Sequence, residues 1–185
     1  MTPDEYWRSG AGLSNITPQG KEWPEGEWFK AWLEVNLISR DVNVLEVGCG
    51  PGRLARLFHP ADYLGLDICP DAIARAREAA PGHLFMIDDG LPYPAYDVTL
   101  FHTVLLHVPD HELRGVISRI TGGYVLVSEI LGRHLRRPGL PPVFNREAQD
   151  YEAAFAPHYR LVESHSYPYV HYKSERLSIL EFVRC

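Results

Sequence analysis

The stretch VLEVGCGPGRL, Val44 to Leu54, decides the fold of this chain. A short apolar run leads into three glycines within five positions, Gly48, Gly50 and Gly52. A strand that enters a glycine-rich turn and then a helix brings backbone N–H groups, and the main chain itself, close to a ligand. The same run carries one carboxylate, Glu46, in what reads as a buried strand. The stretch therefore predicts a ligand-binding loop after the first strand of a sheet.

The segments around this loop alternate between strand-like and helix-like patterns. Apolar runs predict seven strands, at residues 42–47, 63–68, 83–87, 97–101, 124–130, 159–166 and 177–184. Helical patterns fall at 52–58, 70–80 and 109–120, and a further helix is expected after Asn145, a plausible N-cap. The strands read as apolar on both faces. The pattern predicts an α/β fold, a Rossmann-like doubly wound seven-stranded sheet that is mostly parallel, with helices on both faces and an antiparallel C-terminal strand.

Residues 1–41 precede this alternation and are expected to form a separate N-terminal piece, with the sheet domain spanning 42–185. A helix is predicted near Glu25–Ile38, where aromatic residues at 28, 29 and 32 give it a broad apolar face. Two interpretations stay open, a cap on the core and a lid over a substrate. Tyr6 and Trp7 could cover a cationic ligand or simply pack in the core.

Charge and composition narrow the class of protein. The 185 residues carry 18 Lys and Arg against 24 Asp and Glu, a formal net charge of −6, which disfavours a protein that follows a phosphate backbone. The three cysteines, Cys49, Cys69 and Cys185, fit no metal-binding spacing. Because no signal peptide and no membrane span is visible, we expect a cytoplasmic protein with free thiols.

The glycine pattern distinguishes between two kinds of ligand. The dinucleotide fingerprint reads G-x-G-x-x-G, and here Arg53 stands where its third glycine should be. Glu46, two residues before the first glycine, would repel a pyrophosphate but attract a ligand that carries an ammonium group. A nicotinamide cofactor is therefore disfavoured.

The stretch LEVGCGPG, residues 45–52, resembles motif I of the class I S-adenosylmethionine-dependent methyltransferases, in particular their small-molecule, type 11-like branch. YLGLDICPDAIARARE and DDGLPYPAYDVTLFHTVLLHVPD are similar to the next family motifs, and the resemblance extends from about Val42 to the C-terminus. It implies S-adenosylmethionine as cofactor and methyl transfer to an oxygen or nitrogen of a small-molecule acceptor. A protein that binds the cofactor without catalysis, and a methyltransferase acting on a macromolecule, are the alternatives. Neither nucleic acid nor membrane is an expected partner.

The resemblance assigns cofactor-binding roles. Glu46 would interact with the methionine moiety, Asp67 would accept from both ribose hydroxyls, and Asp88 or Asp89 would accept from the adenine amino group. Local structure offers alternatives, Asp67 as the N-cap of the following helix and Asp88-Asp89-Gly90 as a plain turn. The expected cofactor set is Glu46, Gly48, Cys49, Gly50, Gly52, Asp67, Ile68, Asp88, Asp89, Gly90 and His102.

Three residues form the expected catalytic set on the acceptor side, His102, His107 and Glu129, after the fourth and fifth strands. A histidine titrates near neutrality, so either one could take a proton from an acceptor hydroxyl, and core packing is the alternative for both. Glu129 could orient an acceptor or bind Arg133. No metal site is expected, because the two histidines are five positions apart and no third ligand is near. The basic stretch HLRRPG, 134–139, is either a solvated loop or a docking place for an anionic acceptor.

Overall fold

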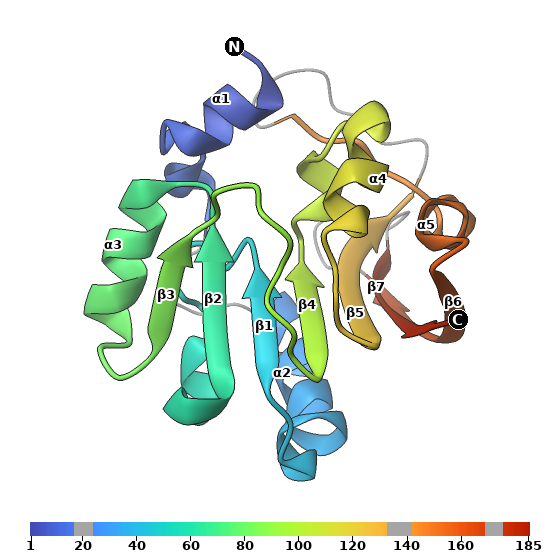
Figure 1. Ribbon diagram of the computed structural model, residues 1–185, viewed down its shortest axis with the longest axis horizontal. Coiled ribbons are helices and arrows are strands. Elements are labelled where there is room, and N and C mark those ends of the chain that lie inside the picture. Colours follow the sequence, from blue (N-terminus) through green and yellow to red (C-terminus); the bar gives the residue numbers. More distant parts are fainter. Residues whose placement is uncertain (17–23, 133–141, 169–175) are drawn as a thin grey trace. The chain divides into compact units, whose positions relative to one another are not determined.

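The computed structural model describes residues 1–16, 24–132, 142–168 and 176–185. The chain divides into two compact units, Met1–Gly90 and Leu91–Cys185. Its strands form a seven-stranded sheet in the order β3-β2-β1-β4-β5-β7-β6 (Figure 1). The strands are β1 (Val44–Val47), β2 (Tyr63–Asp67), β3 (Leu84–Ile87), β4 (Val98–His102), β5 (Tyr124–Leu131), β6 (Tyr159–Pro168) and β7 (Arg176–Arg184).

The strand directions confirm the predicted fold class. β2 runs parallel to β1 and β3, and β4 runs parallel to β5. β7 is antiparallel to both β5 and β6, so that the two last strands form the antiparallel pair expected at the C-terminal edge. The sheet is therefore mostly parallel, as helix-connected strands require.

In the first unit, α3 (Pro70–Ala79) lies against β2 and β3 (Figure 1). Proline in its first turn does no harm, because that N–H has no partner within the helix. The predicted helix at 52–58 is wrong. Gly52 has a φ of 77°, and the segment forms a turn and one short 3-10 helix, η3 (Ala55–Leu57). A left-handed residue at the start of the segment interrupts the α-helical path.

The edge strand β3 departs from the prediction that every strand is apolar and covered on both faces. Leu84, Met86 and Ile87 are 54%, 50% and 47% exposed, whereas Phe85 is buried. β3 is the outermost strand on its side of the sheet. The chain continues from β3 to β4 without an intervening helix, so no crossover helix at this point covers these side chains.

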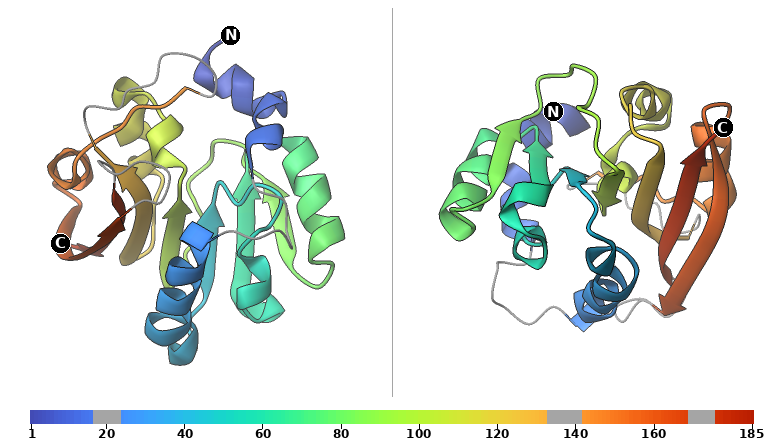
Figure 2. Two further views of the ribbon diagram at one scale, coloured as in Figure 1. Left: turned by 180° about the vertical axis from the view of Figure 1, so that it is seen from behind. Right: turned by 60° about the horizontal axis from the view of Figure 1, so that its bottom comes forward.

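The N-terminal segment of the first unit contributes two helices at opposite ends of the strands. α1 (Pro3–Arg8) lies near the carboxyl ends of β2 and β3, and α2 (Pro24–Asn36) lies near the amino end of β1 (Figures 1 and 2). Phe29 and Leu33 of α2 are fully buried, which supports the core-cap interpretation for that predicted helix. The expected domain boundary after residue 41 stays a prediction.

In the second unit, α4 (Asp110–Ser118) packs on α5 (Ala148–Phe155), which also contacts β6. Asn145 is buried and is not the N-cap of α5, so that prediction is wrong. Glu147 caps the helix instead, because it exchanges hydrogen bonds with Asp150 in a reciprocal capping box. Across the described ranges of the chain, every helix is too short or too polar to cross a membrane.

Candidate functional site

The glycine loop follows β1 and contains three left-handed glycines, with φ of 73° at Gly48, 54° at Gly50 and 77° at Gly52. These conformations are costly for any residue with a Cβ. Space is also limited at Gly52, where a Cβ would lie 3.2 Å from the Phe85 ring and 3.1 Å from an alanine of α3. Among the described residues, a Cβ at Gly50 would meet only Ile16, at 3.4 Å. Gly52 is therefore needed for packing, and Gly50 is the position that leaves the main chain open.

The amides of this loop bind within the protein. The N–H groups of Gly48 and Cys49 both donate to the Leu66 carbonyl oxygen, at 2.7 and 2.9 Å. The N–H of Gly50 donates to Asp67 Oδ2 at 2.8 Å. Amides that are used in this way do not form a phosphate cradle. The expectation that the loop presents its N–H groups to the ligand is wrong for these three amides, and the arrangement further disfavours a dinucleotide.

Asp67 ends β2 and connects the loop to the start of α3. Its Oδ1 accepts from the N–H of Cys69 at 2.8 Å, while its Oδ2 holds Gly50. Cys69 is the N-cap of α3, through its Sγ, so the N-cap alternative for Asp67 is wrong. Burial raises the pKa of Asp67, and the two N–H donors lower it in part. Each carboxylate oxygen has two acceptor positions, so each retains one for a ligand hydroxyl.

Glu46 is 3% exposed in the middle of β1, and its Oε2 accepts the hydroxyl proton of Tyr63. Burial raises the pKa of Glu46 to about 7, although the Tyr63 hydrogen bond and the Arg53 charge lower it in part. The buried carboxylate is thus stabilised by a tyrosine at the start of the neighbouring strand. Sequence reasoning missed Tyr63, because an apolar-looking residue at the start of a strand carries no motif.

The turn after β3 orders the two acidic candidates that follow it. Asp88 is 6% exposed, its N–H donates to the Asp67 carbonyl oxygen at 2.9 Å, and its Oδ1 accepts from Gly90 N–H at 3.0 Å. Asp89 and Gly90 are exposed. The Asp-Asp-Gly turn is therefore real, and the buried carboxylate that lies beside Asp67 at this edge is Asp88 rather than Asp89.

The described part of the N-terminal segment covers the same edge of the first unit. A Cβ at Gly10 would lie 3.4 Å from Asp71 Oδ2 and 3.6 Å from Cys69 Sγ, and Ile16 approaches Gly50. Tyr6 is buried, and its ring meets the ring of its neighbour Trp7 edge to face at 5.3 Å. The segment between α1 and Ile16 is therefore in the position that a lid over the glycine loop requires.

In the second unit, His102 ends β4 in a fully formed strand. It is 4% exposed, and its Nδ1 lies 3.0 Å from Ser128 Oγ on β5. The next residue, Thr103, has a φ of 54°, a left-handed conformation that is rare for a β-branched residue. Such strain persists only where the surroundings fix it, and it is common next to functional groups.

Glu129 of β5 helps to hold the residues that follow Thr103 in place. The side chain is 0% exposed, and Oε1 accepts from the N–H groups of Val104 at 2.9 Å and Leu105 at 2.6 Å. Burial raises the pKa of Glu129 to about 8, and the backbone donors and Arg146 lower it in part. Oε2 has no hydrogen-bond partner among the described residues. Arg133, the suggested ion-pair partner, and the HLRRPG stretch lie outside the described residues.

Arg146 holds the other end of the same loop, and sequence reasoning missed it. Arg146 is 3% exposed, and its side chain donates to the carbonyl oxygens of Leu105 at 2.8 Å and Val108 at 2.7 Å. It also pairs with Asp110 at 2.7 Å. Glu129 and Arg146 together bind N–H and C=O groups at both ends of the segment 104–108. A lone arginine before a helix gives no sequence signal for this role.

His107 lies in η5 (Leu105–His107), within that segment. Its Nδ1 is 2.6 Å from the Pro142 carbonyl oxygen, which can only accept, so Nδ1 carries the proton and Nε2 carries the lone pair. Burial lowers the pKa of His107 to about 4, although the Pro142 bond raises it in part. The imidazole is therefore neutral at neutral pH.

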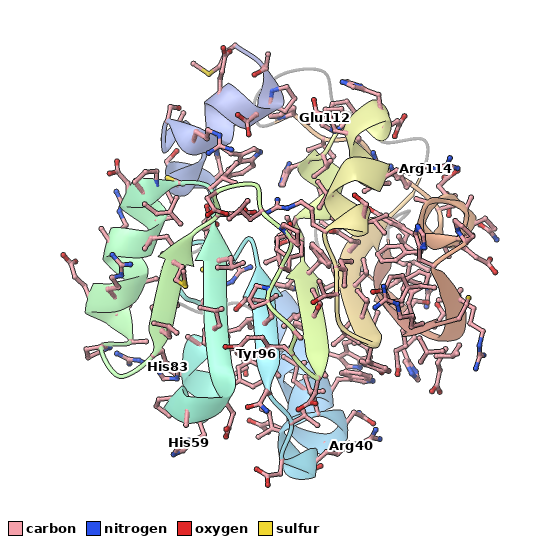
Figure 3. The ribbon with its side chains drawn as sticks, viewed as in Figure 1. Arg40, His59, His83, Tyr96, Glu112 and Arg114 are labelled. Atoms are coloured by element: carbon pink, nitrogen blue, oxygen red, sulfur yellow. The ribbon has the colours of Figure 1, made fainter. Side chains whose placement is uncertain are left out.

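The predicted residues thus gather in two groups. In the first unit the cofactor candidates share the edge at the carboxyl ends of β1 to β3, whereas His59 and His83 lie at the opposite end of β2 and β3 (Figure 3). In the second unit His102, His107 and Glu129 surround the loop after β4. His102, expected in both sets, belongs to the second unit.

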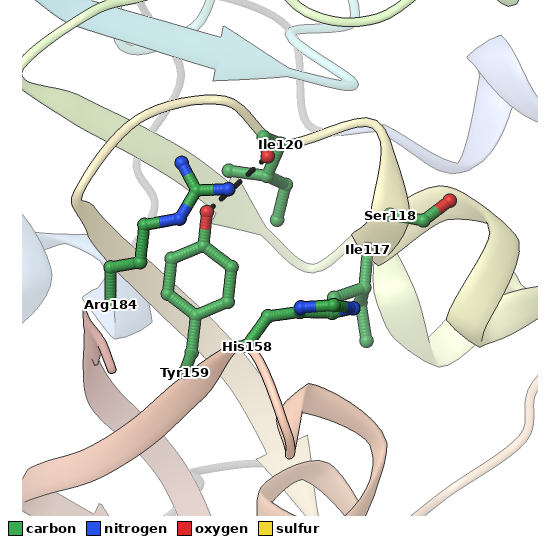
Figure 4. A pocket seen from close by; sticks show the side chains of 6 residues that line it. All are labelled: Ile117, Ser118, Ile120, His158, Tyr159 and Arg184. Carbon is green, nitrogen blue, oxygen red and sulfur yellow. Dashed lines mark hydrogen bonds between the residues drawn. The ribbon is translucent and has the colours of Figure 1, made fainter.

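A small pocket in the second unit is separate from both groups. It has a volume of about 60 Å³ and is lined by Ile117, Ser118, Ile120, His158, Tyr159 and Arg184 (Figure 4). The Tyr159 hydroxyl, a polar group of the lining, already donates to the Gly122 carbonyl oxygen at 2.7 Å. Ligand pockets for small organic molecules measure about 300–1,000 Å³, so this pocket is too small for an acceptor.

Comparisons with known proteins found similarity to methyltransferases. Residues 44–122 match the model of a family described as a methyltransferase domain. The chain is 30% identical over 132 residues to a ribosomal protein L11 methyltransferase of Cupriavidus pinatubonensis, covering 68% of this chain and 40% of that protein. It is 31% identical over 96 residues to a trans-aconitate 2-methyltransferase of Rhodopseudomonas palustris, covering 47% of this chain and 38% of that protein. The chain thus spans about two fifths of the length of these curated relatives.

The fold has a close structural counterpart. The crystal structure of magnesium protoporphyrin IX methyltransferase (ChlM) from Synechocystis PCC 6803 with bound SAH matches with a TM-score of 0.71 at 19% identity, over 99% of this chain and 98% of that chain. At this identity the likeness shows the fold. The sequence similarity comes from the family match, whose residues 44–122 include the glycine loop, Asp67, Asp88, His102 and His107. Residues 44–122 therefore match a methyltransferase domain in sequence, and the fold is that of a methyltransferase crystallised with SAH.

Proposed function

We propose that this chain binds S-adenosylmethionine and transfers its methyl group to an oxygen or nitrogen of a small-molecule acceptor. The observation that supports this most is the position of Asp67. Its two carboxylate oxygens hold the glycine loop and the start of α3, yet each retains one acceptor position for a vicinal diol. The loop amides are used internally, which suits a cationic ligand better than a pyrophosphate.

The residues of the first unit fit the cofactor by their chemistry. Asp67 would hold the ribose, Asp88 the adenine amino group, and Glu46 the ammonium of the methionine part. A cation beside Glu46 would favour its ionised form, against the burial that raises its pKa to about 7. When bound, the cofactor supplies an electrophilic methyl group on a positively charged sulfur. The segment from α1 to Ile16 would act as a lid on this edge.

On the acceptor side we assign positioning and proton handling to the loop after β4. His107 has a pKa of about 4, which suits orienting an acceptor more than removing a proton from a neutral hydroxyl. His102, bound to Ser128, is the second candidate. Glu129 and Arg146 would hold the loop that carries His107 in one conformation. Positioning of this kind can supply roughly 7–11 kcal/mol in favourable intramolecular reactions.

The acceptor class is the part of the proposal that needs a direct test. One relative is named for a ribosomal protein and the other for a small tricarboxylate, trans-aconitate, so relatives point both ways. The acidic net charge of −6 disfavours nucleic acid as the acceptor. A protein that binds the cofactor without catalysis remains the second candidate, because a cofactor site can persist without an acceptor reaction.

Calorimetry against S-adenosylmethionine, SAH and NAD tests the cofactor assignment first. We expect binding of both sulfur ligands and none of NAD. Transfer of a labelled methyl group to small hydroxy, amino and carboxylic acids, and separately to ribosomal protein, tests the acceptor. Labelled small molecules support the proposal. Labelling of the ribosomal protein alone would mean that the acceptor is a protein rather than a small molecule. NAD binding without a response to S-adenosylmethionine or SAH would overturn the proposal.

Turnover of His102→Ala and His107→Ala then separates catalysis from packing. A histidine that handles the acceptor proton should lose about 10²-fold in kcat while cofactor affinity stays nearly constant. A packing histidine should instead lower the melting temperature and leave turnover per folded molecule unchanged. If both variants show only the stability loss, positioning alone carries the reaction.

A further inference from the structure

Three side chains with metal-binding atoms converge on the C-terminal edge of the second unit. Glu163 and His165 lie two positions apart on β6 and therefore point to the same face, and Glu181 lies on the adjacent strand β7. One atom of each, two carboxylate oxygens and an imidazole nitrogen, lies within 4.8 Å of the other two. This cluster is separate from the glycine loop and from the loop after β4.

The separations already resemble those around a metal ion. His165 Nε2 lies 3.3 Å from Glu163 Oε1 and 3.1 Å from Glu181 Oε1. Zinc binds nitrogen and oxygen ligands at about 2.0–2.2 Å in a tetrahedron, so its ligands lie roughly 3.3–3.6 Å apart. The two carboxylate oxygens lie within 4.8 Å of each other, and the Glu163 side chain, which is 60% exposed, can adjust its position.

The strand pairing explains why a cation is favoured here. A β-bulge between Leu161 and Glu163 shifts the register of β6, so that Glu163 lies directly opposite Glu181. Like charges directly opposite on neighbouring strands are destabilising. His165 lies within ion-pair distance of both carboxylates.

Glu181 has the support that metal-binding carboxylates usually have. Its side chain is 12% exposed, and its other oxygen, Oε2, accepts the hydroxyl proton of Tyr124 on β5. Such outer hydrogen bonds orient a ligand and fix its position. His165 is 34% exposed, so an ion can reach the cluster from solvent. Sequence reasoning expected no metal because it examined histidine and cysteine spacing, and Glu181 is far from His165 in the sequence.

We propose that Glu163, His165 and Glu181 bind one divalent transition-metal ion, zinc by preference, with water as the fourth ligand. Nitrogen and carboxylate ligands together suit zinc better than magnesium or calcium, which take oxygen ligands almost exclusively. The ion would neutralise the opposed carboxylates and tie the edge strand β6 to β7. The site does not depend on the proposed function, because it can be measured without cofactor or acceptor.

Cobalt(II), which replaces zinc and absorbs visible light strongly when tetrahedral, is the probe, with zinc calorimetry alongside. We expect one saturable site per chain with micromolar or tighter affinity, displacement of cobalt by zinc, and a melting temperature that rises with zinc concentration. Glu163→Gln and His165→Ala should each weaken binding at least tenfold. Glu163 is exposed, so the first variant should fold normally.

His111→Ala is the matched control. His111 Nε2 lies 3.3 Å from Glu112 Oε1, the same distance as from His165 Nε2 to Glu163 Oε1. This pair lies on α4 and has one carboxylate where the cluster has two (Glu112 is labelled in Figure 3). This variant, and Cys185→Ser, should bind cobalt like the unchanged protein. The proposal is overturned if no saturable site is found, if binding persists in both cluster variants, or if the control variants weaken it equally.

Discussion

Two loops of this protein are held in place by opposite means. The glycine loop of the first unit takes its shape from its own residues, through left-handed glycines and hydrogen bonds to the end of the adjacent strand. The loop after β4 takes its shape from residues 24 to 41 positions away, Glu129 and Arg146, which hold its amide and carbonyl groups. The first loop is therefore held by its glycines and by the next strand, whereas the second depends on side chains from later elements, and variants should separate the two.

The largest effect is expected at Arg146. Arg146→Ala removes the Arg146 donor from the Val108 carbonyl oxygen and leaves the Leu105 carbonyl oxygen with the Val108 N–H alone, which should cost roughly 3 kcal/mol of the free energy of unfolding. Urea unfolding measures this loss. Arg146→Lys is the control, because it keeps the charge but cannot reproduce the forked contacts. A loss below about 1 kcal/mol in Arg146→Ala would show that the loop does not depend on it.

Two glycine substitutions should divide packing from binding in the first loop. Gly52→Val introduces both a left-handed valine and contact with Phe85 and α3, so roughly 2–4 kcal/mol of stability should be lost. Gly50→Val meets only Ile16 among the described residues, so it should lower stability less and weaken cofactor binding more than Gly52→Val. Thermal unfolding and calorimetry on both variants check this. Equal stability losses with equal affinities would contradict the division of roles.

Two buried glutamates, Glu46 beside the glycine loop and Glu129 beside the loop after β4, should contribute to the pH dependence of stability to different extents. Burial raises the pKa of Glu129 to about 8 and that of Glu46 to about 7. The folded protein then binds more protons than the unfolded chain above the ordinary glutamate pKa, so stability falls as pH rises through these values. Each unit of pKa shift corresponds to about 1.4 kcal/mol, an upper bound for each group.

Glu129→Gln and Glu46→Gln, which cannot ionise, test this directly. Each should be less sensitive than the unchanged protein to a rise from pH 5 to pH 9. The gain relative to the unchanged protein should be larger and continue to higher pH for Glu129→Gln, roughly 1–3 kcal/mol by pH 9. Denaturant unfolding across this range is the measurement. Parallel pH profiles for all three proteins would mean that neither carboxyl is neutral when folded.

The difference between the loops also explains what the sequence could predict. Glu46, Gly48, Gly50, Gly52 and Asp67 belong to one glycine-rich loop pattern and the next strand, so the pattern and its resemblance to the methyltransferase family gave them as candidates, and the fold class followed from the strand–helix alternation. Tyr63 and Arg146 were missed because their partners are fixed only by strand register and chain return. Glu129 was expected at the rim, yet its carboxylate is fully buried beneath the loop.

The N-cap of α5 and the exposure of β3 went wrong for related reasons. A capping box two residues beyond Asn145 competes equally well in the sequence, and only the burial of Asn145 decides between them. An apolar strand looks the same whether a helix covers it or not, and β3 has no crossover helix after it. Local patterns specify an element, while its neighbours decide how it is covered.

The affinity of Asp67→Ala for S-adenosylmethionine, measured by calorimetry, tests the central claim most directly. Loss of the carboxylate removes the acceptor for two ribose hydroxyls and should weaken binding by about 1.5–3 kcal/mol, roughly 10- to 150-fold. Asp71→Ala, the same charge change on the exposed first turn of α3, should bind like the unchanged protein. If Asp67→Ala binds as tightly as the unchanged protein, Asp67 does not hold the cofactor and the assignment of this edge is wrong.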